Sequence, residues 1–147
     1  MAEIFQLGPV SYTVNAAVTA GQLVMPDSTT GKVKPATAGA VTVLGVARDS
    51  GAPAGSGTAT DFGTLRPEIA VYSAPYEVKV TFAADTLFGQ KVIAGASGQV
   101  TPIVDPAATG TATATTAGDI TATRGVVGYC TEPGGVLATG TGRIKLV

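Results

Sequence analysis

Apolar residues in this chain alternate with polar ones in short runs, and no long stretch shows the three-to-four-residue spacing of an amphipathic helix. The clearest run is 76–82, in which Tyr76, Val78, Val80 and Phe82 share one face. Alternation with a period of two is typical of a half-buried antiparallel strand. It predicts an all-β fold with little or no helix.

Further short runs of this kind lie between clusters of Gly, Pro, Asp and Ser, which favour turns. Many short strands at close spacing predict a single β domain over residues 1–147, either a small β-barrel or a β-sandwich. One helical turn is expected at 84–88, where Asp85 is placed to cap it. The expected strands are 11–14, 22–25, 32–34, 41–46, 68–72, 76–82, 90–93, 99–103, 125–131 and 143–146.

Two segments, 48–61 and 105–123, are rich in Gly, Ala or Thr and offer little to a core. Residues 1–10 are expected to form an N-terminal arm, and residues 48–61 a flexible loop. Residues 105–123 are a Thr/Ala tract, which is either an exposed β-arm or a disordered loop. Threonine favours strands, but the tract holds almost no large side chain.

The sequence also contains a weak internal repeat. Residues 21–24 and 31–35 (GQLV and GKVKP) resemble residues 89–92 and 98–102 (GQKV and GQVTP). This pattern indicates either a duplicated hairpin unit or chance recurrence in a chain rich in Gly, Val and Pro. In the first interpretation, the Thr/Ala tract is an insertion in the second copy.

Several kinds of chemistry are disfavoured by composition. The chain has no histidine, one cysteine, 13% charged residues and a formal net charge of -1. Histidine-dependent catalysis, Cys₄ and Cys₂His₂ metal sites and a basic surface for nucleic acid therefore have no basis. Cys130 lies in an apolar run and is expected in the core. We expect no enzyme, no cofactor, no metal, and neither nucleic acid nor membrane as a partner.

Large apolar side chains are scarce, and most of the hydrophobic residues are alanine and valine. Small side chains bury little area, so the core is thin. Association with further copies would supply the burial that one chain lacks.

Seven residues are candidates for contact with a partner, and each has a second interpretation. The N-terminal apolar residues either anchor an arm on a partner or close the bottom of a barrel. The tyrosines beside Pro75 either face an interface or pack in the core at a strand corner. The basic residues of the last strand either contact an acidic partner or face solvent. The residues are Ile4, Phe5, Leu7, Tyr72, Tyr76, Arg143 and Lys145.

The runs 18–24, 31–36 and 43–47 (VTAGQLV, GKVKPA and VLGVA) resemble the small β-rich capsid decoration, or head cement, proteins of tailed bacteriophages. The match extends over about residues 10–57, and more loosely over 85–130 through the repeat. The resemblance implies a structural protein that binds the outer surface of a capsid and stabilises it. It implies the major capsid protein and further copies of itself as partners, with a trimer favoured.

The resemblance also implies a place on the virion after synthesis in the host cytoplasm, with no catalysis and no cofactor. An alternative is a phage tail, fibre or adhesion module that binds a host protein or a glycan. If capsid binding uses the chain ends, removing 1–10 or 142–147 should weaken binding and leave the fold intact.

Overall fold

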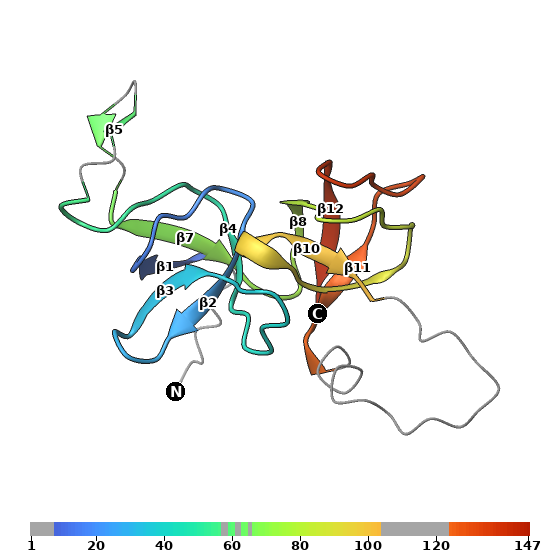
Figure 1. The fold of residues 1–147 in the computed structure, drawn as a ribbon, viewed down its shortest axis with the longest axis horizontal. Helices are drawn as coiled ribbons and strands as arrows, with labels where there is room; N and C mark the ends of the chain where they lie inside the picture. Colours follow the sequence, from blue (N-terminus) through green and yellow to red (C-terminus); the bar gives the residue numbers. More distant parts are fainter. Residues whose placement is uncertain (1–7, 57–58, 61–62, 65, 104–123) are drawn as a thin grey trace, which may run out of the picture.

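A computed structural model describes residues 8–56, 59–60, 63–64, 66–103 and 124–147, and it is built almost entirely of antiparallel strands (Figure 1). There are two five-stranded sheets, with strand orders β1-β7-β4-β2-β3 and β10-β9-β11-β12-β8. The first contains β1 (Val10–Thr13), β2 (Leu23–Asp27), β3 (Lys32–Pro35), β4 (Gly45–Ala47) and β7 (Glu68–Tyr72). The second contains β8 (Glu77–Thr81), β9 (Lys91–Ala94), β10 (Val100–Pro102), β11 (Val126–Cys130) and β12 (Thr141–Leu146).

The all-β prediction is confirmed, and each of the ten expected strands has a counterpart in the two sheets. The sheets do not close into one barrel; they share a hydrophobic cluster, as in a sandwich. A two-stranded hairpin, β5 (Ala59–Thr60) with β6 (Gly63–Thr64), was not expected and begins inside the segment assigned as a loop. Its strands are too short for alternation to be visible.

The helical turn expected at 84–88 is wrong. Thr86 instead forms an antiparallel bridge with Val136, donating and accepting backbone hydrogen bonds of 2.8 Å. The Asp85 carboxylate accepts a 2.7 Å bond from the backbone N–H of Ala138 rather than from its own segment. Pairing with a distant loop therefore overrides the local helical preference. The turn between β9 and β10 contains a short 3₁₀ segment, Ala96–Gly98.

The two sheets have the same topology, as expected for the duplicated unit that the sequence repeat indicates. In chain order, β1, β2, β3, β4 and β7 of the first sheet correspond to β8, β9, β10, β11 and β12 of the second. Corresponding strands have corresponding neighbours in the two sheets. The residue pairing also matches. Leu23 pairs with Val46 and Val24 with Gly45, as Lys91 pairs with Tyr129 and Val92 with Gly128. We call the unit from β1 to β7 the first repeat and the unit from β8 to β12 the second repeat.

Equivalent short contacts recur outside the strands. The parallel bridge between Val14 and Val33 has its counterpart between Phe82 and Val100. The side chain of Gln22 accepts a bond from the backbone of Thr19, as that of Gln90 does from Leu87. The tract 105–123 falls between β10 and β11, at a connection that is shorter in the first repeat, and lies outside the described residues.

One hydrophobic cluster lies within the first repeat, and a second joins the two repeats. Leu23, Ala36 and Val46 of the first repeat belong to the cluster that fills the second repeat around Phe82. Hydrogen bonds reinforce the junction. Gly98 N donates to Ala36 O at 2.8 Å, Gly39 N to Ala94 O at 2.9 Å, and Gln22 Nε2 to Ser97 O at 3.0 Å. The repeats are thereby held side by side, as Figure 1 shows. The larger cluster contains Leu23, Ala36, Val46, Val78, Val80, Phe82, Val92, Ala94, Val100, Val127, Cys130, Ile144 and Leu146.

Candidate functional surfaces

The described residues hold little reactive chemistry. None of their His, Cys, Asp or Glu side chains form a group of three or more that would hold a metal ion. Cys130 is buried in the shared cluster, as predicted, and Lys79 and Lys145 lie on exposed faces, which does not suit a lysine nucleophile. Within the same part of the chain, no helix has the length and hydropathy needed to span a membrane.

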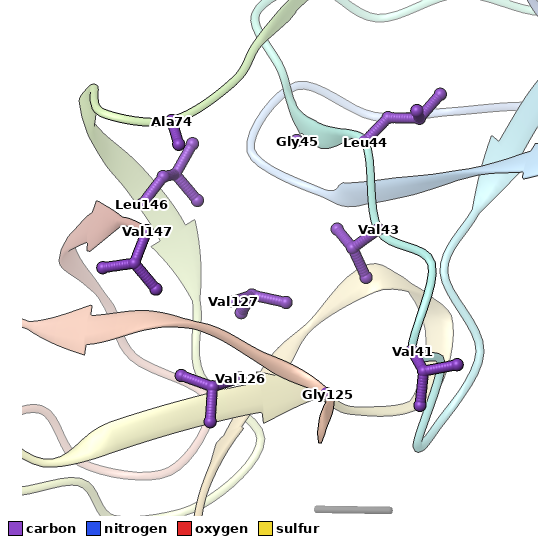
Figure 2. Close-up of a pocket in the computed structure, with 10 residues that line it drawn as sticks. All are labelled: Val41, Val43, Leu44, Gly45, Ala74, Gly125, Val126, Val127, Leu146 and Val147. Atoms are coloured by element: carbon purple, nitrogen blue, oxygen red, sulfur yellow. The ribbon is translucent and has the colours of Figure 1, made fainter. Parts of the chain in front are cut away.

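A small apolar pocket lies where the β3–β4 connection of the first repeat meets the C-terminal end of the second (Figure 2). Val41, Val43 and Leu44 line one side, with Val126 and Val147 among the residues on the other. Its volume is about 70 Å³. Ligand sites usually measure roughly 300–1,000 Å³ and contain several convergent polar groups. This pocket between the repeats is therefore smaller than a usual ligand site.

The corner between the two repeats brings the predicted tyrosines together. Tyr72 ends β7, Tyr76 precedes β8, and the Ala74–Pro75 peptide bond between them is cis. The ring centroids are 5.3 Å apart, and both rings are half-buried against the shared cluster. The strand corner is thus confirmed. Each tyrosine both packs in the core and exposes part of its surface.

An open groove of about 600 Å³ runs beside this corner, and Tyr76 and Glu77 line it together with Gly8 and Val10. The groove therefore places Tyr76 next to the first described residues of the chain. The other predicted contact residues at this end, Ile4, Phe5 and Leu7, lie outside the described residues.

The basic residues of β12 differ in their surroundings. The guanidinium of Arg143 contacts Glu132 at 3.1 Å and Glu77 at 3.3 Å. The hydrogen bond with Arg143 lowers the pKa of Glu132 and raises that of Arg143. The positive charge of Arg143 is therefore balanced by two carboxylates of its own repeat. Lys145 is exposed on the same face and forms no ion pair with any described residue.

The structure argues against the expectation that residues 142–147 can be removed with the fold intact. β12 lies between β11 and β8 and pairs with both. Ile144 is fully buried and Leu146 is 3% exposed. The alternation of Arg143, Ile144, Lys145 and Leu146 reports a half-buried strand correctly, but alternation does not distinguish a central strand from an edge.

An exposed apolar tip on the second repeat was not predicted from the sequence. Leu87, Phe88 and Leu137 are 72%, 66% and 76% exposed, and they lie on two loops joined by the bridge between Thr86 and Val136. Exposed apolar residues that gather at one place mark interaction surfaces. Aligning the two repeats reveals the signal, because the first repeat has the small residues Thr19, Ala20 and Ala52 at these positions.

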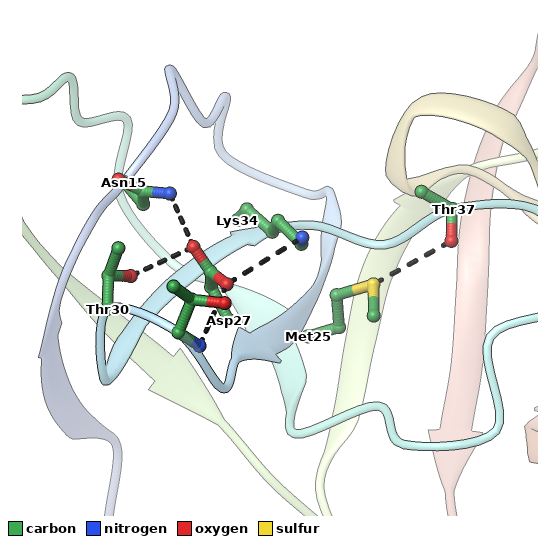
Figure 3. A network of polar contacts seen from close by, with 7 residues as sticks. Asn15, Met25, Asp27, Thr30, Lys34 and Thr37 are labelled. Carbon is green, nitrogen blue, oxygen red and sulfur yellow. Dashed lines mark hydrogen bonds and ion pairs between the residues drawn. The ribbon is translucent and has the colours of Figure 1, made fainter.

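A polar network stabilises the β2–β3 turn of the first repeat (Figure 3). The Asp27 carboxylate accepts hydrogen bonds from Asn15 Nδ2 at 2.6 Å and Thr30 Oγ1 at 2.9 Å, and Lys34 Nζ lies 4.0 Å away. The hydrogen bond from the Thr30 side chain is the main cause that lowers the pKa of Asp27 below its usual value. The backbone N–H of Thr29, the charge of Lys34 and the side chain of Asn15 act in the same direction. The network orders a turn and leaves its carboxylate ionised.

The lowered pKa predicts an acid-sensitive contribution to folding. A carboxyl group with a folded-state pKa below its unfolded value stabilises the fold above the unfolded pKa, and loses this effect as the pH falls through the folded pKa. We expect Asp27→Asn to be less stable than the wild type at pH 7, with the difference shrinking below about pH 4. Urea unfolding at several pH values measures this. In an NMR titration, Thr30→Val should raise the Asp27 midpoint, and an unchanged midpoint would contradict the assigned cause.

Comparison with known proteins places the chain in no family. No protein-family model matches it, and no curated protein matches it either. Among solved structures, it is similar to the head fiber gp8.5 N base of bacteriophage phi29, with 13% sequence identity and a TM-score of 0.49. That similarity covers 95% of this chain and 92% of the other.

Proposed function

We propose that this protein is a structural component of a tailed-bacteriophage virion, which binds the outer surface of the capsid and stabilises it by bridging capsid subunits. The proposal rests on how the residues that resemble decoration proteins fold. They make one continuous unit, β2 to β4, and the chain contains this unit twice. Its partners are the major capsid protein and further copies of itself, with a trimer favoured.

Duplication suits a bridging role for a physical reason. A bridge needs two attachment surfaces held at a fixed separation, because the second contact then forms without a further loss of translational freedom. The two repeats are held side by side through a shared core and three hydrogen bonds. Burial of apolar surface at both ends would add up across a seam between capsid subunits.

Fractionation of particles from the native source tests the proposal. The lysate is sedimented through a density gradient, and the chain is quantified in each fraction. Co-migration with DNA-filled particles at a fixed, high copy number is expected. A few copies per particle would instead indicate a tail or fibre protein, and migration only as a small free species would overturn the virion assignment.

The apolar tip supplies a directed variant for the same assay. Replacing Leu87 and Leu137 together with serine should lower capsid occupancy at subsaturating protein by about tenfold, because two exposed apolar contacts are lost. Val41→Ser is the matched control, since Val41 is 53% exposed and lies away from the tip. Equal occupancy of the double variant and the control would exclude the tip from the capsid contact.

A further inference from the structure

The contact between the two repeats uses different surfaces on each side. The first repeat contributes a face of its sheet, and the second contributes its edge strand β8 with the β9–β10 turn. A cleft of about 340 Å³ between them is lined from both sides. We call these surfaces the sheet face and the edge face. The sheet face contains Ala20, Gly21, Leu23, Val46 and Tyr72; the edge face contains Lys79, Val80, Thr81, Gly98 and Thr141.

Because the two repeats share one topology, each carries both surfaces, and among the described residues each uses only one of them. The matched strand registers give the equivalent positions. The counterpart of the sheet face lies on the second repeat and is called the open sheet face. It contains Phe88, Gly89, Lys91, Tyr129 and Lys145. The counterpart of the edge face lies on the first repeat and is called the open edge face. It contains Ser11, Tyr12, Thr13, Gly31 and Glu68.

Glycines on both sides show that no described residue covers the equivalent surfaces at these positions. A Cβ added to Gly21 would lie 3.4 Å from the Lys79 carbonyl oxygen, whereas nothing lies within 4 Å of one added to Gly89. A Cβ added to Gly98 would lie 2.8 Å from the Leu23 carbonyl oxygen, whereas nothing lies within 4 Å of one at Gly31. Within the described chain, these two surfaces therefore lack the contact that their counterparts make.

The open surfaces carry complementary charges. Lys145 stands where the used sheet face has Tyr72, and Glu68 stands where the used edge face has Thr141. Lys91 replaces Leu23, and it would meet the β2–β3 turn that carries Asp27. Neither lysine, nor Glu68, has an ion pair in the described part of the chain.

Aromatic side chains add apolar area to both surfaces. Phe88, which is 66% exposed, takes the place of Ala20 on the open sheet face, and Tyr129 takes the place of Val46. Tyr12 takes the place of Val80 on the open edge face, where Val10 is 37% exposed. Tyrosine and phenylalanine are enriched at protein interfaces.

We propose that a second copy of this chain binds head to tail, with the open sheet face of one chain on the open edge face of the next. The contact would repeat the one already made between the repeats inside each chain. The inference rests on the self-association within the proposed function and assigns its two surfaces. A heterologous contact of this kind either closes into a ring or extends into a filament.

Cross-linking between two different variants tests the pairing on the isolated protein, with no capsid present. Phe88→Cys chains are mixed with Ser11→Cys chains and treated with a bis-maleimide. The linker is the shortest that joins Ala20→Cys to Lys79→Cys within one chain, which is the equivalent internal pair. We expect a mixed dimer from the two variants and little product from either variant alone. Leu137→Cys mixed with Ser11→Cys is the control, since Leu137 lies on the tip but outside the open sheet face.

Three results would overturn the inference: a wild-type chain that sediments as a monomer at every concentration, no mixed dimer, or equal product from a single variant. Charge reversal provides a second test by sedimentation equilibrium. Lys145→Glu should weaken association about two- to fivefold, and adding Glu68→Lys to the same chain should restore it. No restoration would contradict the assigned pairing. A self-associating chain that fails to bind particles would refute the capsid role and leave this inference standing.

Discussion

Alanine at Gly45 or at Gly128 should destabilise the protein by about 3 kcal/mol or more. A Cβ at Gly45 would lie 2.0 Å from the carbonyl oxygen of Tyr72, and one at Gly128 would lie 2.3 Å from that of Lys145. Both oxygens belong to the neighbouring strand, so the strands must separate to admit the methyl group. Because the obstacle is backbone, no side-chain movement relieves it. Urea unfolding of the two variants measures the loss.

Gly8→Ala is the matched control, since nothing lies within 4 Å of a Cβ at that position. Its free energy of unfolding should stay within about 0.5 kcal/mol of the wild type. The two glycines occupy the same position in the two repeats, so we expect similar losses. Wild-type stability of either variant would show that β4 and β7, or β11 and β12, lie farther apart than described.

Replacing Phe82 with alanine should cost about 3–5 kcal/mol. Its ring is fully buried in the cluster that joins the two repeats, and it is the largest fully buried side chain among the described residues. Removing it leaves a cavity that neighbours on several strands cannot fill, which adds to the lost burial. The free energy of unfolding from chemical denaturation reports the change.

Phe88→Ala changes the same residue type at an exposed position and should alter stability by no more than about 0.5 kcal/mol. Val14→Ala, at the position equivalent to Phe82 in the first repeat, should cost about 1.5–3 kcal/mol because fewer apolar atoms are removed. If Phe88→Ala were as costly as Phe82→Ala, the tip would be part of a core and not a free surface.

The two repeats differ in sequence at the surface through which they meet each other. At the pair of positions that face outward from β2 and β4, the first repeat has Leu23 and Val46, which are buried against the second repeat. The second repeat has Lys91, which is exposed, and Tyr129, which is half-buried. Strands of the same topology therefore carry an apolar surface where the repeats pack and a partly charged one at the equivalent place on the second repeat. This difference explains why the internal repeat is weak in sequence and plain in topology.

The ten strands of the two sheets were determined by local sequence, whereas the hairpin of β5 and β6 was not, and the sequence left open whether the repeat was a duplication. Alternation in residues such as Val78, Val80 and Phe82 reports which face of a strand is buried, and Gly-rich clusters report where it turns. Both signals act between residues that are close along the chain. The same locality made Cys130 predictable as a core residue.

Only the tertiary structure decided which strands are central, which loops pair and which surfaces remain open. The helical turn expected at 84–88 gave way to a bridge with Val136, and β12 proved to be central, with Ile144 fully buried. The exposed tip at Leu87, Phe88 and Leu137 joins two loops that are far apart in the chain. These features depend on contacts between distant segments, and no local pattern of residues encodes the free energy of such contacts.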